Sequence, residues 1–451
     1  MKNSFRWFCI VSVLWVVANP LMAQKVSEKK EIAVFNLSYY DWNIPDAALG
    51  AIDEQIRAVF INMRRFDVVG LTQRLGVKDV NTFIDKIKDF KSRNVQIPEK
   101  VLMGQEAFTE ADWNRLVGAF LVVIPSVSYF NLERLRDGSY KATLQTSFTI
   151  LNVEKLQTTA QFYVETSGQD KTQNGAIKAA IDGIPLMLQF QLRKVEEFQI
   201  KSGIVQIMGS DVIFELGKNM GIMVGDEFSI VSYRQVAGFQ AADEVGLIVV
   251  KEVQDQFSVG KVIYSSRRPQ VGDQIQEIPR IGIEAMLFGG AFLVDNYEMP
   301  FIPQLGLKAV ASRGFFSTRP VVGAEIPLSI ATAALSIFDI IPMNVYMGAE
   351  ITNLYLGRVQ IAPTLVVGLG GAYLGENARA FFNTDQEYFM THVGGKAFLT
   401  LSVLVSRDTK ITVDAGYGLW LGLAEALIDV DDKSYFATKV GPFVNVGVTF
   451  K

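Results

Sequence analysis

Residues 393–421 read VGGKAFLTLSVLVSRDTKITVDAGYGLWL, and apolar residues take every second position along most of this stretch. A polar break, residues 406–409, divides it into two segments. Because successive side chains of a strand point to opposite faces, each segment predicts a strand with one apolar face. The break is short enough for a tight turn, so the two strands are expected to pair antiparallel.

The same alternation recurs on both sides of this stretch, and residues 281–451 contain eight such segments. Each has roughly the ~9–11 residues that a tilted strand needs to cross a membrane. An even number of such strands is typical of an outer-membrane β-barrel, which the last third of the chain resembles. Short connections predict periplasmic turns at residues 313–318, 357–358 and 406–409. Longer ones predict outer loops at residues 295–302, 329–341, 373–390 and 422–436.

The polar face of these segments carries five charged residues, namely Lys308, Glu325, Glu350, Lys396 and Asp414. Strands that alternate up and down place all five near mid-membrane, where a charge facing lipid costs ~2–4 kcal/mol. We therefore expect them to pair across a lumen that eight strands leave just wide enough for side chains. The prediction is a plugged barrel, held by an internal ionic and polar cluster, with no open pore. The alternative is a soluble sandwich whose polar face meets water.

The composition of the 451 residues limits the possible chemistry. There is one cysteine, Cys9, which excludes a disulfide framework and a cysteine-ligated zinc site. A net charge of −4 argues against a nucleic-acid partner. The chain is more charged and poorer in glycine before residue 281 than after it, which indicates a change of architecture or of solvent.

The first 23 residues have the order of a secretory signal peptide. Lys2 and Arg6 precede an apolar run at residues 7–18, and Ala23 is a small residue suited to cleavage. The run is short for a spanning helix, which needs ~20 residues. We expect cleavage after Ala23 rather than a retained anchor, which leaves an exported chain without cysteine.

Residues 24–198 predict an α/β domain. Strands are expected at 31–37, 66–71 and 119–130, a hairpin at 140–153 and 156–166, and helices at 46–60, 80–90 and 109–116. A closing helix at 175–198 should kink or split at Pro185. Four segments carry a family resemblance: IAVFNL (32–37), RRFDVVG (64–70), ADWNRLVGAFLVVIPSVSYF (111–130) and TSFTILNVEKLQTTAQFYVE (146–165). Their order resembles the periplasmic module of the TolB N-terminal domain, CsgG-type proteins and the middle domain of flagellar assembly protein T.

Residues 199–280 predict a small all-β domain. The strand candidates are 203–208, 211–214, 227–232, 244–253 and 256–264. Two glycine–aspartate turns, one with Gly221, Gly225 and Asp226 and one with Gly272 and Asp273, suit tight connections between barrel strands. No Gly-Lys-Ser/Thr follows, so a phosphate loop is excluded. The stretch 204–275 resembles the SH3-like barrel domain of flagellar assembly protein T.

Residues suited to catalysis are scarce. The only histidine, His392, is expected to face inward near the outer rim of the barrel and to form hydrogen bonds there. Asp429, Asp431 and Asp432 predict a solvated acidic loop, with a weak Ca²⁺ site as the alternative. The sequence predicts no enzyme, no cofactor and no metal site.

These features predict an outer-membrane protein whose barrel anchors two periplasmic modules as an interaction scaffold. The resemblance implies a flagellar or other cell-envelope machine as the protein partner, besides membrane lipid. One alternative is a surface receptor or adhesin acting through the loop at 373–390. Another is a secretion or transport component in which the N-terminal module forms a ring, so a homo-oligomer is possible.

Overall fold

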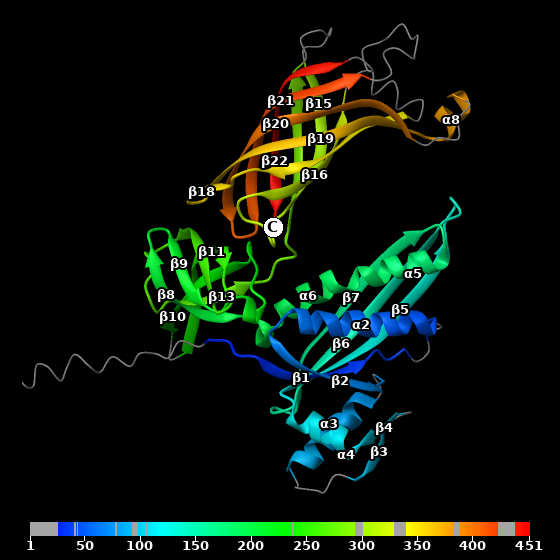
Figure 1. The fold of residues 1–451 in the computed structure, drawn as a ribbon, viewed down its shortest axis with the longest axis vertical. Coiled ribbons are helices and arrows are strands. Elements are labelled where there is room, and N and C mark those ends of the chain that lie inside the picture. Colours follow the sequence, from blue (N-terminus) through cyan, green and yellow to red (C-terminus); the bar gives the residue numbers. More distant parts are fainter. Residues whose placement is uncertain are drawn as a thin grey trace, which may run out of the picture.

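The computed structural model describes residues 26–451 except 40–41, 43, 77–78, 93–97, 104–105, 237–238, 294–300, 329–339, 383–387 and 423–437. The expected signal peptide and the acidic loop with Asp429 therefore lie outside the described residues. Three units follow one another along the chain: an α/β unit, a six-stranded barrel and an eight-stranded barrel (Figure 1). Among the described residues, no helix has the length and apolar character needed to cross a membrane.

The α/β unit contains a five-stranded sheet of order β2-β1-β5-β6-β7. β1 pairs parallel with β2 and β5, and β5 to β7 form an antiparallel meander. The strands are β1 (Lys30–Asn36), β2 (Phe66–Arg74), β5 (Leu121–Arg134), β6 (Tyr140–Asn152) and β7 (Gln157–Asp170). Ile32 and Val34 face one core, while Ala33 and Phe35 face the other, so β1 is buried on both faces.

Helices cover both faces of this sheet. Helices α2 (Asp46–Asn62), α5 (Gln173–Asp182) and α6 (Ile184–Lys194) cover one face, and α3 (Val80–Ser92) and α4 (Glu110–Gly118) cover the other. The expected closing helix is split, with Pro185 in the first turn of α6, where its missing N–H costs no hydrogen bond. A hairpin of β3 (Lys100–Met103) and β4 (Glu106–Thr109) was not expected.

The six-stranded barrel closes in the order β10-β11-β12-β9-β8-β13. Its strands are β8 (Lys201–Met208), β9 (Asp211–Glu215), β10 (Glu227–Val236), β11 (Phe239–Val253), β12 (Phe257–Ser265) and β13 (Gln274–Ile278). Short 3₁₀ turns, η2 (Glu196–Phe198) and η3 (Lys218–Met220), lie before β8 and after β9. The interior is apolar, with Phe214, Phe228 and Ile248 fully buried. The sixth strand, β13, was missed; the SH3-like assignment stays a prediction.

The eight-stranded antiparallel barrel is confirmed. Eight long strands of 9 to 19 residues form one sheet that the pairing of β17 with β19 closes. They are β14 (Ile283–Leu293), β15 (Phe301–Ala311), β16 (Arg319–Pro327), β17 (Ile340–Glu350), β19 (Val359–Leu374), β20 (Tyr388–Ser406), β21 (Thr409–Gly422) and β22 (Lys439–Phe450). A short strand, β18 (Leu354–Leu356), pairs with the start of β19.

The two ends of this barrel differ. The short connections 312–318, 357–358 and 407–408 lie at one end, here called the turn end, which faces the other two units (Figure 1). The opposite loop end carries α8 (Glu376–Phe382). The expected loop at 373–390 is therefore shorter than predicted, because β19 and β20 extend into it as far as the pair Tyr373 and Tyr388. Most of the loops expected at 295–302, 329–341 and 422–436 lie outside the described residues.

The outer wall of the eight-stranded barrel is apolar. Leu287, Leu307, Met347 and Val367 have exposed fractions between 57% and 64%. Leu287 has buried neighbours on both sides, and each of the other three has one buried neighbour and one half-buried glycine. The wall therefore follows the period of two that the sequence shows. An exposed apolar surface of this extent around a barrel requires an apolar surrounding.

Candidate functional site: the charged barrel interior and the three-unit junction

All five charged residues expected inside the barrel are buried there, with exposed fractions of 3% or less. Lys308 on β15 contacts Asp414 on β21, with Nζ to Oδ2 at 2.6 Å. Thr400 adds a hydroxyl that donates to Asp414 at 2.7 Å. Three strand positions separate β15 from β21 around the barrel, so this pair crosses the lumen.

A second pair crosses the lumen nearer the loop end. Lys396 on β20 forms an ion pair with Glu325 on β16. The Lys396 ammonium also lies 4.6 Å from the centre of the Phe443 ring, and Asn344 donates to Glu325 at 3.2 Å. Packing of charges against rings and amides fills the interior, as expected for a barrel of eight strands.

Glu350 lies elsewhere than predicted. It is the last residue of β17 and therefore sits at the turn end, not near the middle of the strand. Its partner is Arg319, the first residue of β16, with Nη2 to Oε2 at 2.5 Å. Alternation indicates which face of a strand a residue lies on, but not how far along the strand it lies, and this caused the error.

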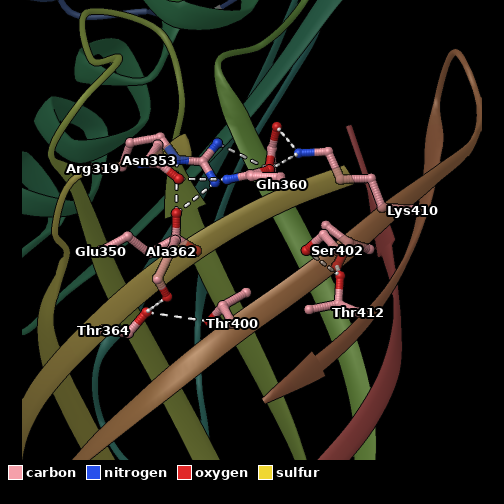
Figure 2. A network of polar contacts seen from close by, with 12 residues as sticks. Arg319, Glu350, Asn353, Gln360, Ala362, Thr364, Thr400, Ser402, Lys410 and Thr412 are labelled. Carbon is pink, nitrogen blue, oxygen red and sulfur yellow. Dashed lines mark hydrogen bonds and ion pairs between the residues drawn. The ribbon is translucent and has the colours of Figure 1, made fainter. Parts of the chain in front are cut away.

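The turn end holds a larger network that sequence reasoning missed (Figure 2). Arg319 contacts Glu284 at 3.2 Å, and Lys410 contacts Glu284 at 2.8 Å. Gln360 accepts from Lys410 at 2.9 Å and donates to Asn353 at 2.6 Å. Glu284, Arg319 and Lys410 share the inward face with the five predicted residues. Period-two alternation could therefore have identified them as interior residues from the sequence.

The six-stranded barrel covers the turn end. Leu247, Val249 and Ile263 of that barrel pack with Leu404 at the end of β20 in one buried cluster. The guanidinium of Arg358 lies 4.0 Å from the centre of the Tyr264 ring across the same contact. The mouth that faces the other units is thus closed by protein.

Glu277 of β13 joins the six-stranded barrel to the α/β unit. Its carboxylate accepts from Arg65 at 2.6 and 2.8 Å, from Arg193 at 2.5 Å and from the backbone N–H of Ile200 at 3.2 Å. Burial alone raises the pKa of Glu277, but Arg193 and then Arg65 outweigh it and lower the pKa to about 2. The carboxylate is therefore ionised at neutral pH.

Asp226 joins all three units. It accepts from Arg193 of α6 at 2.9 Å and from Arg313 of the eight-stranded barrel at 2.8 Å. Its second oxygen accepts from the Met223 N–H at 2.9 Å, the local turn bond expected of a glycine–aspartate turn. The turn residue expected from the sequence thus also forms the centre of the junction.

The glycines of this turn allow the units to approach closely. Gly225 has φ +81°, and a Cβ there would lie 1.9 Å from the Ser312 carbonyl oxygen of the eight-stranded barrel. Gly221 has φ +72°, and a Cβ there would lie 2.1 Å from the Met63 carbonyl oxygen of the α/β unit. Both positions require glycine for conformation and for space.

The second glycine–aspartate turn, with Gly272 and Asp273, makes its contacts within the six-stranded barrel. Gly272 has φ +96° with open space where a Cβ would lie, and Asp273 binds Arg267 with two contacts at 2.7 and 2.9 Å.

His392 is buried near the loop end of β20, and its Nδ1 lies 2.7 Å from the Thr391 hydroxyl. Within the described ranges, no group of three His, Cys, Asp or Glu side chains is placed to hold a metal ion.

Comparisons with known proteins find similar solved structures only. No family model matches the chain, and no curated protein matches it. The PelC dodecamer from Paraburkholderia phytofirmans is 13% identical with a TM-score of 0.24, and the match covers 37% of this chain and 91% of that one. Neisserial surface protein A is 11% identical with a TM-score of 0.25, over 38% of this chain and 95% of that one. A major outer membrane protein from Thermus thermophilus is 13% identical with a TM-score of 0.21, over 37% and 98%.

These similarities are too low to carry a functional argument. One of the three structures is described as a surface protein and another as a major outer membrane protein. They give no support to the resemblance with flagellar assembly protein T, which stays a prediction. The class defined here by fold and site is an eight-stranded, outer-membrane-type barrel with a charged interior, joined to two further units.

Proposed function

We propose that this protein is an outer-membrane anchor that holds its α/β unit and six-stranded barrel in the periplasm as a scaffold for a cell-envelope protein assembly. The observation that carries the proposal is the buried junction, where Arg193 binds Asp226 and Glu277 at once. Removing one partner of such a buried pair costs ~3–5 kcal/mol, so the units keep one relative geometry. A fixed geometry is what a scaffold requires and a flexible tether lacks.

The barrel polarity supports the membrane location. The outer wall is apolar and the charged residues are kept inside, whereas a barrel dissolved in water carries its charges outside. The turn end faces the other two units, and short turns are periplasmic in bacterial barrels. Both units then lie on the periplasmic side, which agrees with the export signal expected in the first 23 residues.

The filled lumen favours an anchor over a transporter. Lys308 reaches Asp414 and Lys396 reaches Glu325 across the barrel, and the six-stranded barrel covers the turn end. The α/β unit offers a surface for a partner: β7 is the last strand of its sheet, and Tyr163 on it is 62% exposed. A flagellar or other envelope machine as the partner is part of the proposal, as is the absence of enzymatic activity.

Site-specific photo-crosslinking in cells that produce the protein tests the scaffold. A photoreactive residue replaces Tyr163 on β7 or, as the matched control, Tyr417 on the apolar barrel wall, which is 54% exposed. We expect a protein adduct of defined mass from position 163 and no protein adduct from position 417. An adduct of twice the chain mass identifies a second copy of this protein as the partner.

The opposite pattern contradicts the proposal. Without a protein adduct at position 163, or at further exposed positions of the same sheet edge, the α/β unit is no scaffold. Steady ion conductance of the purified protein in planar bilayers would favour the transport alternative. Protein adducts confined to the loop end would favour the receptor or adhesin alternative.

A further inference from the structure

A groove of about 710 Å³ lies where the three units meet at the turn end. Its volume falls within the ~300–1,000 Å³ of typical ligand pockets. Phe190 and Lys194 of α6 line one side, Val231 and Ala242 of the six-stranded barrel another, and the outer wall of the eight-stranded barrel the third. This wall contributes the residues Ile283, Ala285 and Phe450.

The third side continues onto the apolar wall of the barrel. Ala285 on β14 pairs with Phe450 on β22, and the next outward pair along the same seam is Leu287 with Val448. Leu287 and Val448 are 60% and 40% exposed, so an unbroken apolar path leads from the groove along the barrel. In a membrane this path is lined by the acyl chains of the periplasmic leaflet.

Cationic groups also line the groove, at the level that the phospholipid headgroups of the periplasmic leaflet would occupy. Arg280 and Arg407 face it, but both are matched by carboxylates, at 2.6 Å from Asp408 and 2.7 Å from Glu244. Lys194 is exposed and lies 4.2 Å from the centre of the Phe190 ring, with no carboxylate in ion-pair contact in the described part of the chain. Its ammonium group is therefore available to an anionic ligand.

We propose that this groove binds one glycerophospholipid of the periplasmic leaflet, with the phosphate at Lys194 and the acyl chains along Ile283, Ala285 and Phe450. An apolar wall that continues into the bilayer and a cation at its edge match the two halves of such a lipid. A bound lipid would fill the angle between the α/β unit and the barrel and would seal the junction at the membrane surface. The inference rests on the proposed outer-membrane location of the barrel.

Native mass spectrometry of the full-length protein in mild detergent tests this, after equilibration with phosphatidylglycerol micelles. We expect one retained phospholipid per chain in the wild type. Lys194→Gln should lower the retained fraction about fivefold, the effect of one cation at a membrane surface. Lys178→Gln is the matched control, because Lys178 lies on the neighbouring helix α5, is paired with Asp182 at 2.6 Å and does not line the groove.

A second pair of variants tests the acyl contact. Ala285→Trp fills the groove and should abolish lipid retention, whereas Ala397→Trp, on the lipid-facing side of β20 outside the groove, should not. Equal retention by the wild type, Lys194→Gln and Ala285→Trp overturns the inference, as does a wild type that retains no lipid. Displacement of the lipid by soluble glycerol 3-phosphate also overturns it, since phosphate alone would then be recognised.

The electrophoretic mobility of unheated and boiled samples distinguishes a wrong lipid site from a wrong proposed function. A folded barrel migrates differently before and after boiling. Loss of lipid with the mobility shift retained overturns only the lipid site. Loss of the shift in the wild type overturns the barrel assignment itself.

Discussion

The six-stranded barrel buries Phe214, Phe228 and Ile248 in its interior, whereas the eight-stranded barrel buries Lys308, Glu325 and Asp414 beside its apolar cluster. On the outside the contrast is reversed, because the wall of the larger barrel exposes leucine, valine and methionine. Both are closed antiparallel sheets that follow the same period of two. The larger barrel thus carries apolar residues on its outer face as well as inside, as expected for a wall that faces an apolar solvent.

The comparison also explains the buried charges. In the larger barrel, buried ion pairs share the interior with an apolar cluster that includes Phe398, Trp420 and Phe443. In the smaller barrel, the buried carboxylates are Asp226, Glu227 and Glu277, and each contacts a residue outside this barrel. Buried charge thus marks the inside of one barrel and the outer contact surface of the other.

The largest effect is expected at the contact surface of the smaller barrel. Glu277→Gln leaves two buried guanidiniums, Arg65 and Arg193, without this carboxylate and should lower the free energy of unfolding by ~3–5 kcal/mol. Urea-dependent proteolysis of the full chain in detergent measures it, with the exposed Glu215→Gln as the control. A change of the same size in both variants would show that the junction is not held by this charge.

The same carboxylate predicts a pH dependence. Because its folded-state pKa is lowered from 4.5 to about 2, Glu277 contributes stability that is fully present above pH 4.5 and is lost as the pH falls through 2. The wild type should therefore lose stability from pH 5 to 2 more steeply than Glu277→Gln. Parallel curves for the two proteins would contradict the role given to this ion pair.

Inside the larger barrel, one ion pair allows a double-variant test. Lys308→Met leaves the Asp414 carboxylate buried without its cation and should cost up to ~3–5 kcal/mol, less the contribution that Thr400 retains. Lys308→Met combined with Asp414→Leu removes both charges and should recover most of the loss. The midpoint of urea unfolding reports both. Additive losses in the double variant would mean that the two residues do not act as a pair.

On the outer wall, an arginine distinguishes lipid from water. Val367→Arg, at the middle of β19 on the lipid-facing side, should cost ~2–4 kcal/mol and lower the fraction of heat-modifiable protein. Leu186→Arg, at a position of α6 that is 47% exposed, should stay within ~0.5 kcal/mol. Two equally mild substitutions would indicate that the barrel wall meets water.

The smallest effect is expected at the edge of the junction. Arg407 and Glu244 form a 2.7 Å pair with side chains that are 44% and 30% exposed. Glu244→Gln should change the free energy of unfolding by only ~0.2–1 kcal/mol, and less in high salt, because water screens this pair. A loss as large as that of Glu277→Gln would show that this edge, and not the buried centre, fixes the units.

The barrel was predictable from the sequence because period-two alternation extends over long strands and repeats eight times. The α/β elements were predictable for the same reason of length, and Pro185 marked the break between α5 and α6. Short elements were missed: β13 has five residues, and β3 and β4 have four each, too few for a periodic signal.

The junction was not predictable, because its partners are far apart in sequence. Arg65 is 212 residues from Glu277, and Arg313 is 87 residues from Asp226. Nothing local distinguishes Asp226 in a tight turn from any other turn aspartate. Its second role depends on how three units dock, which alternation, capping and turn chemistry within one unit do not specify.

Protease accessibility of the full-length chain in intact and outer-membrane-permeabilised cells tests the central claim most directly. The account predicts that residues 26–280 stay intact when protease is added to intact cells and are degraded after permeabilisation, while the barrel strands stay with the membrane fraction. Cleavage within residues 26–280 in intact cells, or recovery of the uncleaved chain in the soluble periplasmic fraction, would contradict it.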